Sequence, residues 1–212
     1  MDDTVNAQGV NRANQTDQAN PSGYSHQNKQ ANRSTQANQS TKDTPANSTD
    51  LTDPSKQTVP IRCEGVAVVL MKRCLDQYHV LMLKRAGRML HNEWCYIGGG
   101  IEHGEKAWEA ALREIREETG ITEVRLYTSN QFEQFYSPTE DYIYMAPVFV
   151  GYVNEHQPVR LNHEHSEHRW MTFEEAKRHA ALPGIDDILD FVEKHFAKKA
   201  PSKWLQINIE NE

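Results

Sequence analysis

The sequence predicts an α/β domain that follows a long polar leader. Three observations predict it: nearly all aromatic and aliphatic residues lie between residues 58 and 200, short β-branched runs there are typical of strands, and two segments repeat apolar residues at helical spacing. A segment of this length has the size of one ordinary domain. Residues 201–212 follow this domain in the chain. Polar and apolar side chains alternate there from Trp204 to Ile209, which predicts either an edge strand or a tail.

The leader, residues 1–57, is built mainly from Asn, Gln, Ser, Thr, Asp and Ala. Its only aromatic residue is Tyr24, and its only branched aliphatic residues are Val5, Val10 and Leu51. Such a segment cannot bury enough apolar surface to offset the entropy of ordering the chain, so we expect it to be disordered. It has no positively charged stretch followed by an apolar one, and we therefore expect no secretory signal peptide.

Two paired strands are expected at the start of the domain. Glu64–Met71 and Tyr78–Lys84 are apolar, β-branched runs joined by a short polar link. Trp94–Ile97 predicts a further short strand that leads into a glycine-rich loop. The connection before it, Arg85–Asn92, carries basic residues, and we expect it to form a basic lip near the site that the glycine loop builds.

The glycine-rich loop runs into an acidic helix, predicted at Glu105–Thr119. At about 100° per residue, Glu114, Glu117 and Glu118 fall within one arc of roughly 100°, because residues three and four apart share a face of a helix. A second face is apolar and must pack on a core; it comprises Trp108, Ala111, Leu112, Ile115 and Thr119. The helix therefore has an anchoring face and a separate acidic face.

The clustered carboxylates predict a site for a divalent cation. Like charges on one face repel each other, and carboxylate oxygens without thiols favour a hard ion such as Mg²⁺ or Mn²⁺. The alternative is a solvated acidic face balanced by Arg113 and Arg116. Gly98, Gly99 and Gly100 favour the metal site, because glycines let backbone atoms approach a ligand or an ion closely.

The rest of the domain is predicted as two strands followed by two helices. Leu126–Phe135 and Tyr142–Val153 are strand-like, and Pro147 makes the second an edge strand or one with a bulge, because proline donates no ladder hydrogen bond. Thr172 and Glu175 form the capping-box signature that opens a short helix. A final amphipathic helix is indicated by apolar residues at helical spacing, namely Ile185, Ile188, Leu189, Val192 and Phe196.

The glycine loop and the acidic helix resemble the signature of a known enzyme family. Gly99, Glu105 after five further residues, and Arg113–Ile121 after seven more match the Nudix box at its defining positions. The resemblance implies an α/β/α sandwich around a mixed sheet. It also implies metal-dependent hydrolysis of a nucleoside diphosphate linked to another group, with Glu105 and Arg113 as a buried pair that stiffens the junction of loop and helix.

The same resemblance assigns roles to the acidic face. Glu114, Glu117 and Glu118 are implied as metal ligands, one of which also orients or deprotonates the attacking water. The carbonyl of Gly98 is implied as a further ligand, because the family often supplies one from the residue before the first glycine of the box.

A second acidic stretch, His163–Trp170, supplies one more candidate. In the family, a glutamate in the loop before a strand that ends in tryptophan often completes the metal site or serves as the base, and Glu164 stands in that position. In an extended chain Glu164 would share a face with Trp170, and Glu167 would point the other way. Glu164 is therefore the candidate, with Glu167 in reserve.

The expected reaction is hydrolysis of a nucleoside triphosphate or a similar substrate, which releases monophosphate and pyrophosphate. The run Val159–Ala176 is similar to the nucleoside triphosphate and dihydroneopterin triphosphate branch of the family. Alternatives are ADP-ribose, another nucleotide sugar or a dinucleotide as substrate, and a non-catalytic module that senses a nucleotide. Lys84, Arg85 and Arg88 are candidates for binding the distal phosphates, with plain surface charge as the alternative.

Composition argues against several other classes of protein. The formal net charge of −7 has the wrong sign for general nucleic-acid binding, and no apolar run approaches the roughly 18 residues of a membrane span. Cys63, Cys74 and Cys95 are odd in number and lack C-x-x-C spacing, which fits a reducing compartment without structural disulfides or zinc. We expect a cytoplasmic enzyme with a small nucleotide as its partner, and the sequence leaves a homodimer open.

Overall fold

The structure is a computed structural model and describes residues 57–208. Nearly all of the predicted leader lies outside the described residues. The chain forms, in order, β1 (Ile61–Arg62), β2 (Gly65–Cys74), β3 (Gln77–Arg85), β4 (Trp94–Cys95), β5 (Ile97–Gly100), α1 (Ala107–Thr119), β6 (Arg125–Ser137), β7 (Tyr142–Val153), β8 (His165–Met171), α2 (Phe173–His179) and α3 (Ile185–Val192). A π-helical turn, Glu193–Ala197, continues α3, and a short 3₁₀ turn, Lys203–Leu205, follows.

The strands form one mixed sheet in which β2 is central. β7 pairs in parallel with β2 and β1, whereas the pairs β2–β3, β2–β5, β3–β4, β3–β8 and β6–β7 are antiparallel. β2 pairs with β5 over residues 65–68 and with β3 over residues 71–74, while β7 occupies its other edge. β3 and β5 therefore share one edge of β2 and part from each other in the middle of that strand.

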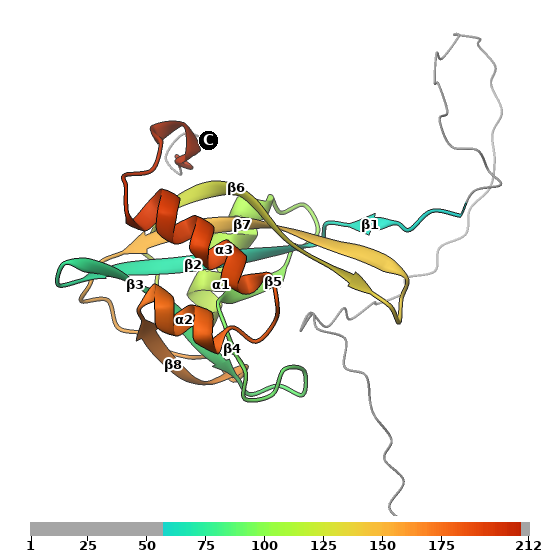
Figure 1. Ribbon diagram of the computed structural model, residues 1–212, viewed down its shortest axis with the longest axis horizontal. Helices are drawn as coiled ribbons and strands as arrows, with labels where there is room; N and C mark the ends of the chain where they lie inside the picture. The colour runs from blue at the N-terminus through green and yellow to red at the C-terminus, as the bar shows by residue number, and fades with distance from the viewer. Residues whose placement is uncertain (1–56, 209–212) are drawn as a thin grey trace, which may run out of the picture.

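Helices cover both faces of the sheet, which confirms the predicted α/β/α sandwich around a mixed sheet. In β2, Val66, Val68 and Leu70 pack in the core beneath α1, and Val69 and Met71 pack in the core beneath α2 and α3. Figure 1 shows α1 behind the strands and α2 and α3 in front of them. β2 is buried on both faces, so its sequence is a continuous apolar run rather than an alternating one.

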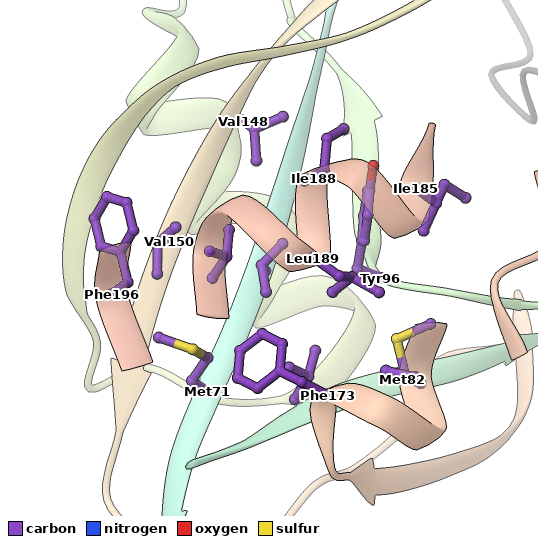
Figure 2. Close-up of a cluster of buried hydrophobic side chains, with 14 of the residues drawn as sticks. Met71, Met82, Tyr96, Val148, Val150, Phe173, Ile185, Ile188, Leu189 and Phe196 are labelled. Atoms are coloured by element: carbon purple, nitrogen blue, oxygen red, sulfur yellow. The ribbon is translucent and has the colours of Figure 1, made fainter. Parts of the chain in front are cut away.

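The core beneath α3 confirms the predicted apolar stripe of the last helix. Ile185, Ile188 and Leu189 of α3 belong to one buried cluster with Val148 and Val150 of β7 and Met71 of β2, and Figure 2 labels these side chains. Phe196, in the turn that continues α3, is buried in the same core. The Thr172–Glu175 capping box is also present at the start of α2.

Several predicted boundaries were wrong. α1 begins at Ala107 rather than Glu105, because Glu105 lies in the preceding turn, where its N–H donates to the carbonyl of Glu102. β7 is not an edge strand: Pro147 falls between the residues that pair with β1 and those that pair with β2, so neither strand requires its missing N–H. The bulge lies in β6, between Thr128 and Gln131.

Two further features lie at the margins of the domain. The far ends of β6 and β7 run past the helices as a twisted hairpin, with β1 beside β7 (Figure 1). The C-terminal segment follows β6, since the N–H of Ile207 donates to the carbonyl of Leu126 and Gln206 bridges to Tyr127. In the described part of the chain, no helix is long and apolar enough to cross a membrane.

Candidate active site

Glu118 is the most buried of the predicted acidic residues, with 2% of its surface exposed. The N–H of Gly98 donates to its carboxylate, while its Oε2 atom has no hydrogen-bond partner among the described residues. Burial raises the pKa of Glu118 well above its usual range, and the negative charges of Glu114 and Glu164 raise it further. A buried carboxylate with an unpartnered oxygen is costly unless a cation or a donor approaches it.

Glu114 lies directly against the glycine strand β5. A Cβ atom on Gly99 would overlap the Glu114 carboxylate, so only glycine allows this approach. Burial also raises the pKa of Glu114, although Arg113 opposes the shift. At the other end of α1, Gly120 ends the helix in the left-handed conformation, with φ of 70°.

Arg113 joins the loop to the helix. It donates to both carboxylate oxygens of Glu105, at 3.0 Å each, and to the carbonyl of Gly100 at 2.7 Å. Its Nη1 group also contacts Glu114 at 2.6 Å and Glu117 at 3.2 Å. Because of these contacts, the pKa of Glu105 is held below its usual range and that of Arg113 is raised. The structure thus brings Glu105 and Arg113 together, as the resemblance implied. It also shows that Arg113 contacts Glu114 and Glu117.

Glu164 lies in the loop just before β8, close enough for its charge to act on Glu114 and Glu118. The loop is fixed by its backbone: the N–H of Ala86 donates to the Glu164 carbonyl at 2.8 Å, and the Glu164 N–H donates to the Asn162 side chain at 3.0 Å. Glu164 precedes the strand rather than belonging to it. The alternation of side chains along a strand, from which we predicted the direction of Glu164, therefore does not apply to this residue.

Glu167, the reserve candidate, is turned away from the box glutamates. Its carboxylate pairs with Arg169 at 2.6 Å and lies 3.9 Å from the ammonium of Lys84. Both cations also lie over the ring of Trp94, which belongs to the core beneath α2 and α3. The structure therefore places Lys84 and Glu167 on the sheet face opposite α1.

Only one of the three basic candidates reaches the carboxylates. The positive charge of Arg85 acts on Glu118 and on the Cys95 thiol, whose pKa burial raises to about 12. Arg85 also donates from Nε to the Met89 carbonyl at 3.2 Å. Arg88 is exposed on the connection between β3 and β4 and is not among the main charges that act on Glu114 or Glu118.

The donor set fits a hard divalent cation. Glu114, Glu118 and Glu164 offer carboxylate oxygens, one of which is unpartnered and buried, and Gly98 offers a backbone carbonyl. Within residues 57–208, however, no three acidic, histidine or cysteine side chains already surround a common point. Glu117 is half exposed and turned toward Arg113 at 3.2 Å, so it would have to rotate to join the others.

Sequence analysis missed a polar pair on the other sheet face. The hydroxyl of Tyr96, the residue between β4 and β5, donates to the Glu133 carboxylate of β6 at 3.1 Å. Glu133 lines a cavity of about 420 Å³ between the β6–β7 hairpin and the loop before α3. The sequence signal was available, since Glu133 lies on the inward-facing side of an alternating strand, but only the structure brings Tyr96 to it.

Comparisons with known proteins agree with this geometry. A sequence model of the NUDIX domain matches residues 63–191. Nucleoside triphosphatase NudI from Escherichia coli is 31% identical over 86 residues, which are 37% of this chain and 61% of the relative. The chain thus spans about three fifths of the length of this curated relative.

Solved structures share the fold. An Ap4A hydrolase binary complex from C. elegans superposes with a TM-score of 0.55 and 21% identity, covering 63% of this chain and 96% of that chain. The E. coli dihydroneopterin triphosphate pyrophosphohydrolase gives 0.52 and 21%, covering 63% and 96%. A MutT protein from Methanosarcina mazei Go1 gives 0.51 and 27%, covering 66% and 95%.

Proposed function

Since the chain belongs to the NUDIX family, we propose that it hydrolyses a phosphoanhydride bond of a nucleotide with a bound divalent cation. The observation that supports this most is Glu118, a buried carboxylate with an unpartnered oxygen beside two other carboxylates. Structural ion pairs also bury carboxylates, but they do so with a cation in contact. Here Arg113 serves Glu105, Glu114 and Glu117, and no ion pair engages Glu118 among the described residues.

The acidic group would hold Mg²⁺ or Mn²⁺. Such an ion neutralises charge around phosphorus and lowers the pKa of a bound water. Glu118, Glu114 and the Gly98 carbonyl are the proposed ligands, and Glu117 is a fourth once it leaves Arg113. Arg113 fixes the loop and the helix relative to each other, which keeps these oxygens in place.

Glu164 is the proposed base. Its charge acts on Glu114 and Glu118, and it lies outside the ion pairs of Arg113, so its carboxylate is placed to accept a proton from the attacking water. In the reaction, one P–O bond forms to the water oxygen and one bridging P–O bond breaks. Arg85, whose positive charge acts on Glu118, is placed to bind a phosphate oxygen as the charge there develops.

We propose a nucleoside triphosphate as the substrate and a nucleoside monophosphate and pyrophosphate as the products. The similarity to nucleoside triphosphatase NudI supports this class over ADP-ribose, another nucleotide sugar or a dinucleotide. We further propose that the catalytic domain spans residues 58–200, with the leader and the C-terminal segment outside it.

The test is a substrate panel with product analysis. The full chain would be incubated with the four ribonucleoside triphosphates, ADP-ribose and a dinucleoside tetraphosphate, with Mg²⁺ or with EDTA. We expect pyrophosphate and monophosphate from at least one triphosphate, only with metal, and a loss of roughly 10²-fold or more for Glu117→Gln or Glu118→Gln. Glu123→Gln, a change at an exposed glutamate beyond the C-terminal end of α1, is the control. Turnover unaffected by EDTA, or by both box variants, would refute the proposal.

A further inference from the structure

The cavity beside the β6–β7 hairpin, called the slot below, has an aromatic wall and an aliphatic wall. One wall carries Phe135, whose ring stacks on Tyr144 of β7 with 4.8 Å between centroids. The loop before α3 and α3 itself supply an aliphatic wall from Leu182, Ile185 and Ile188. Aromatic and apolar walls of this kind hold nucleobases by stacking, whatever the base. The walls therefore provide binding without selectivity.

Selectivity requires a polar group, and Glu133 is a half-buried carboxylate in the lining of the slot. It faces the same side of the hairpin as Phe135, because Glu133 pairs with Ala146 and Phe135 pairs with Tyr144. Tyr96 donates to Glu133 Oε2 at 3.1 Å, and Figure 2 shows its ring passing between Ile185 and Ile188. A carboxylate has about four acceptor positions, so one tyrosine leaves most of them available to a ligand.

The slot and the acidic group lie on either side of one junction. β4 pairs with β3 and β5 pairs with β2, and Tyr96 joins the two strands where the sheet divides. The charges of both Glu118 and Glu133 raise the pKa of Cys95, the residue before Tyr96. This shared neighbour is the observation that links the slot to the acidic group.

The hydrogen-bonding groups on the edge of each base decide which base a half-buried carboxylate can bind. Adenine and cytosine place one amino donor beside a ring nitrogen that is an acceptor, and uracil flanks its single N–H with two carbonyls. Guanine presents a ring N–H next to an amino group, two donors that match the two oxygens of a carboxylate, and the pterin ring has the same edge. Burial, which raises the pKa of Glu133, makes unmatched acceptors there costly.

We propose that Glu133, oriented by Tyr96, is the specificity-determining residue and selects a base with this 2-amino-4-oxo edge, as in guanine or a pterin. The proposal rests on the proposed function for the position of the phosphates. Base recognition itself does not depend on turnover. Binding and hydrolysis can therefore be tested separately.

The binding test uses nucleoside monophosphates, which are not hydrolysed. Isothermal titration of the full chain with GMP, AMP, CMP and UMP in Mg²⁺ should show GMP binding about 10- to 100-fold more tightly than the others, the range expected for one bidentate contact to a base. Glu133→Gln should reduce that ratio to within about threefold, because an amide presents one acceptor and one donor. Tyr96→Phe, which removes only the hydroxyl, should keep a smaller preference, and Glu123→Gln is the matched control.

The outcomes separate this proposal from the proposed function. Equal binding of the four monophosphates, or a GMP preference that survives Glu133→Gln in a folded protein, would overturn the role of Glu133 even if triphosphates are hydrolysed. A GMP preference that depends on Glu133 would support it even if no hydrolysis is found. Comparing kcat/KM for GTP and dihydroneopterin triphosphate then shows whether guanine or a pterin is preferred. A higher kcat/KM for ATP than for either of them would contradict the proposal.

Discussion

Replacing Glu118 with glutamine should inactivate the enzyme and at the same time stabilise the metal-free protein. The carboxylate is buried, its Oε2 atom is unpartnered, and the charges of Glu114 and Glu164 act against it. An amide in its place can still accept the Gly98 N–H, and its NH₂ group can donate toward Glu114. The variant thus removes the repulsion between Glu118 and the other two carboxylates, and it also removes a metal ligand.

The size of the gain follows from the buried oxygen. Leaving a buried acceptor unpaired costs about 1–3 kcal/mol, and in a domain of this size each kcal/mol shifts Tm by about 2–4 °C. Glu118→Gln should therefore raise Tm by at least about 2 °C at neutral to alkaline pH. A gain of this kind is unusual, because most substitutions of buried residues destabilise a protein.

The gain should depend on pH in a definite direction. Burial raises the folded-state pKa of Glu118 above its unfolded value, so the folded protein binds this proton more tightly than the unfolded chain does. The stability of the wild type therefore falls as pH rises from the unfolded pKa toward the folded one. Glutamine does not ionise, so the advantage of the variant should be small at about pH 5 and larger at about pH 8.

Thermal unfolding in EDTA, followed by circular dichroism across this pH range, measures the effect. Glu117→Gln is the control, because the Glu117 side chain is half exposed and paired with Arg113, so it should lose activity without gaining stability. A Glu118→Gln protein that melts below the wild type at about pH 8, or whose shift does not change with pH, would refute this reasoning about Glu118.

The remaining predictions concern the loop, the base and the leader. Gly99→Ala should keep the fold, because the flexible Glu114 side chain can move away from the added methyl group. Displacing this metal ligand should lower kcat/KM by roughly 10²-fold. Wild-type kinetics would show that Glu114 is not needed in its present position. Glu164→Gln should lower kcat with little change in KM, and Glu167→Gln should be milder in the same assay at saturating Mg²⁺; the reverse order would contradict the placement of the base. Deleting residues 1–57 should change neither Tm nor kcat/KM, and a Tm lower by several degrees would show that the leader docks on the domain.

The acidic helix could be predicted because its chemistry is local. Glu114 and Glu118 share a face by helical periodicity alone, and the apolar face of the same helix follows from the same count. The β2 and β3 strands were found for a similar reason, since their apolar runs suit strands that are buried on both faces. Errors fell at ends and turns, as at Glu105, which lies in a turn closed by its hydrogen bond to the carbonyl of Glu102.

The rest of the site depends on pairings between distant segments. Lys84 and Arg85 are adjacent in sequence but point to opposite faces of β3, which no composition argument could assign. The irregular pairing of β3 with β8 places Glu164 outside the strand, so alternation could not orient it. Tyr96 and Glu133 are 37 positions apart and meet only because the sheet divides between β3 and β5.

The central claim is that Glu114, Glu118 and their neighbours hold the catalytic cation. A crystal of the full chain or of residues 58–208 soaked with Mn²⁺, and measured at a wavelength where manganese scatters anomalously, locates that ion directly. We expect an anomalous peak within about 2.0–2.4 Å of carboxylate oxygens of Glu118 and Glu114, with Glu117 turned away from Arg113. A peak elsewhere on the surface, with these side chains unmoved in a protein that turns over with Mn²⁺, would contradict it.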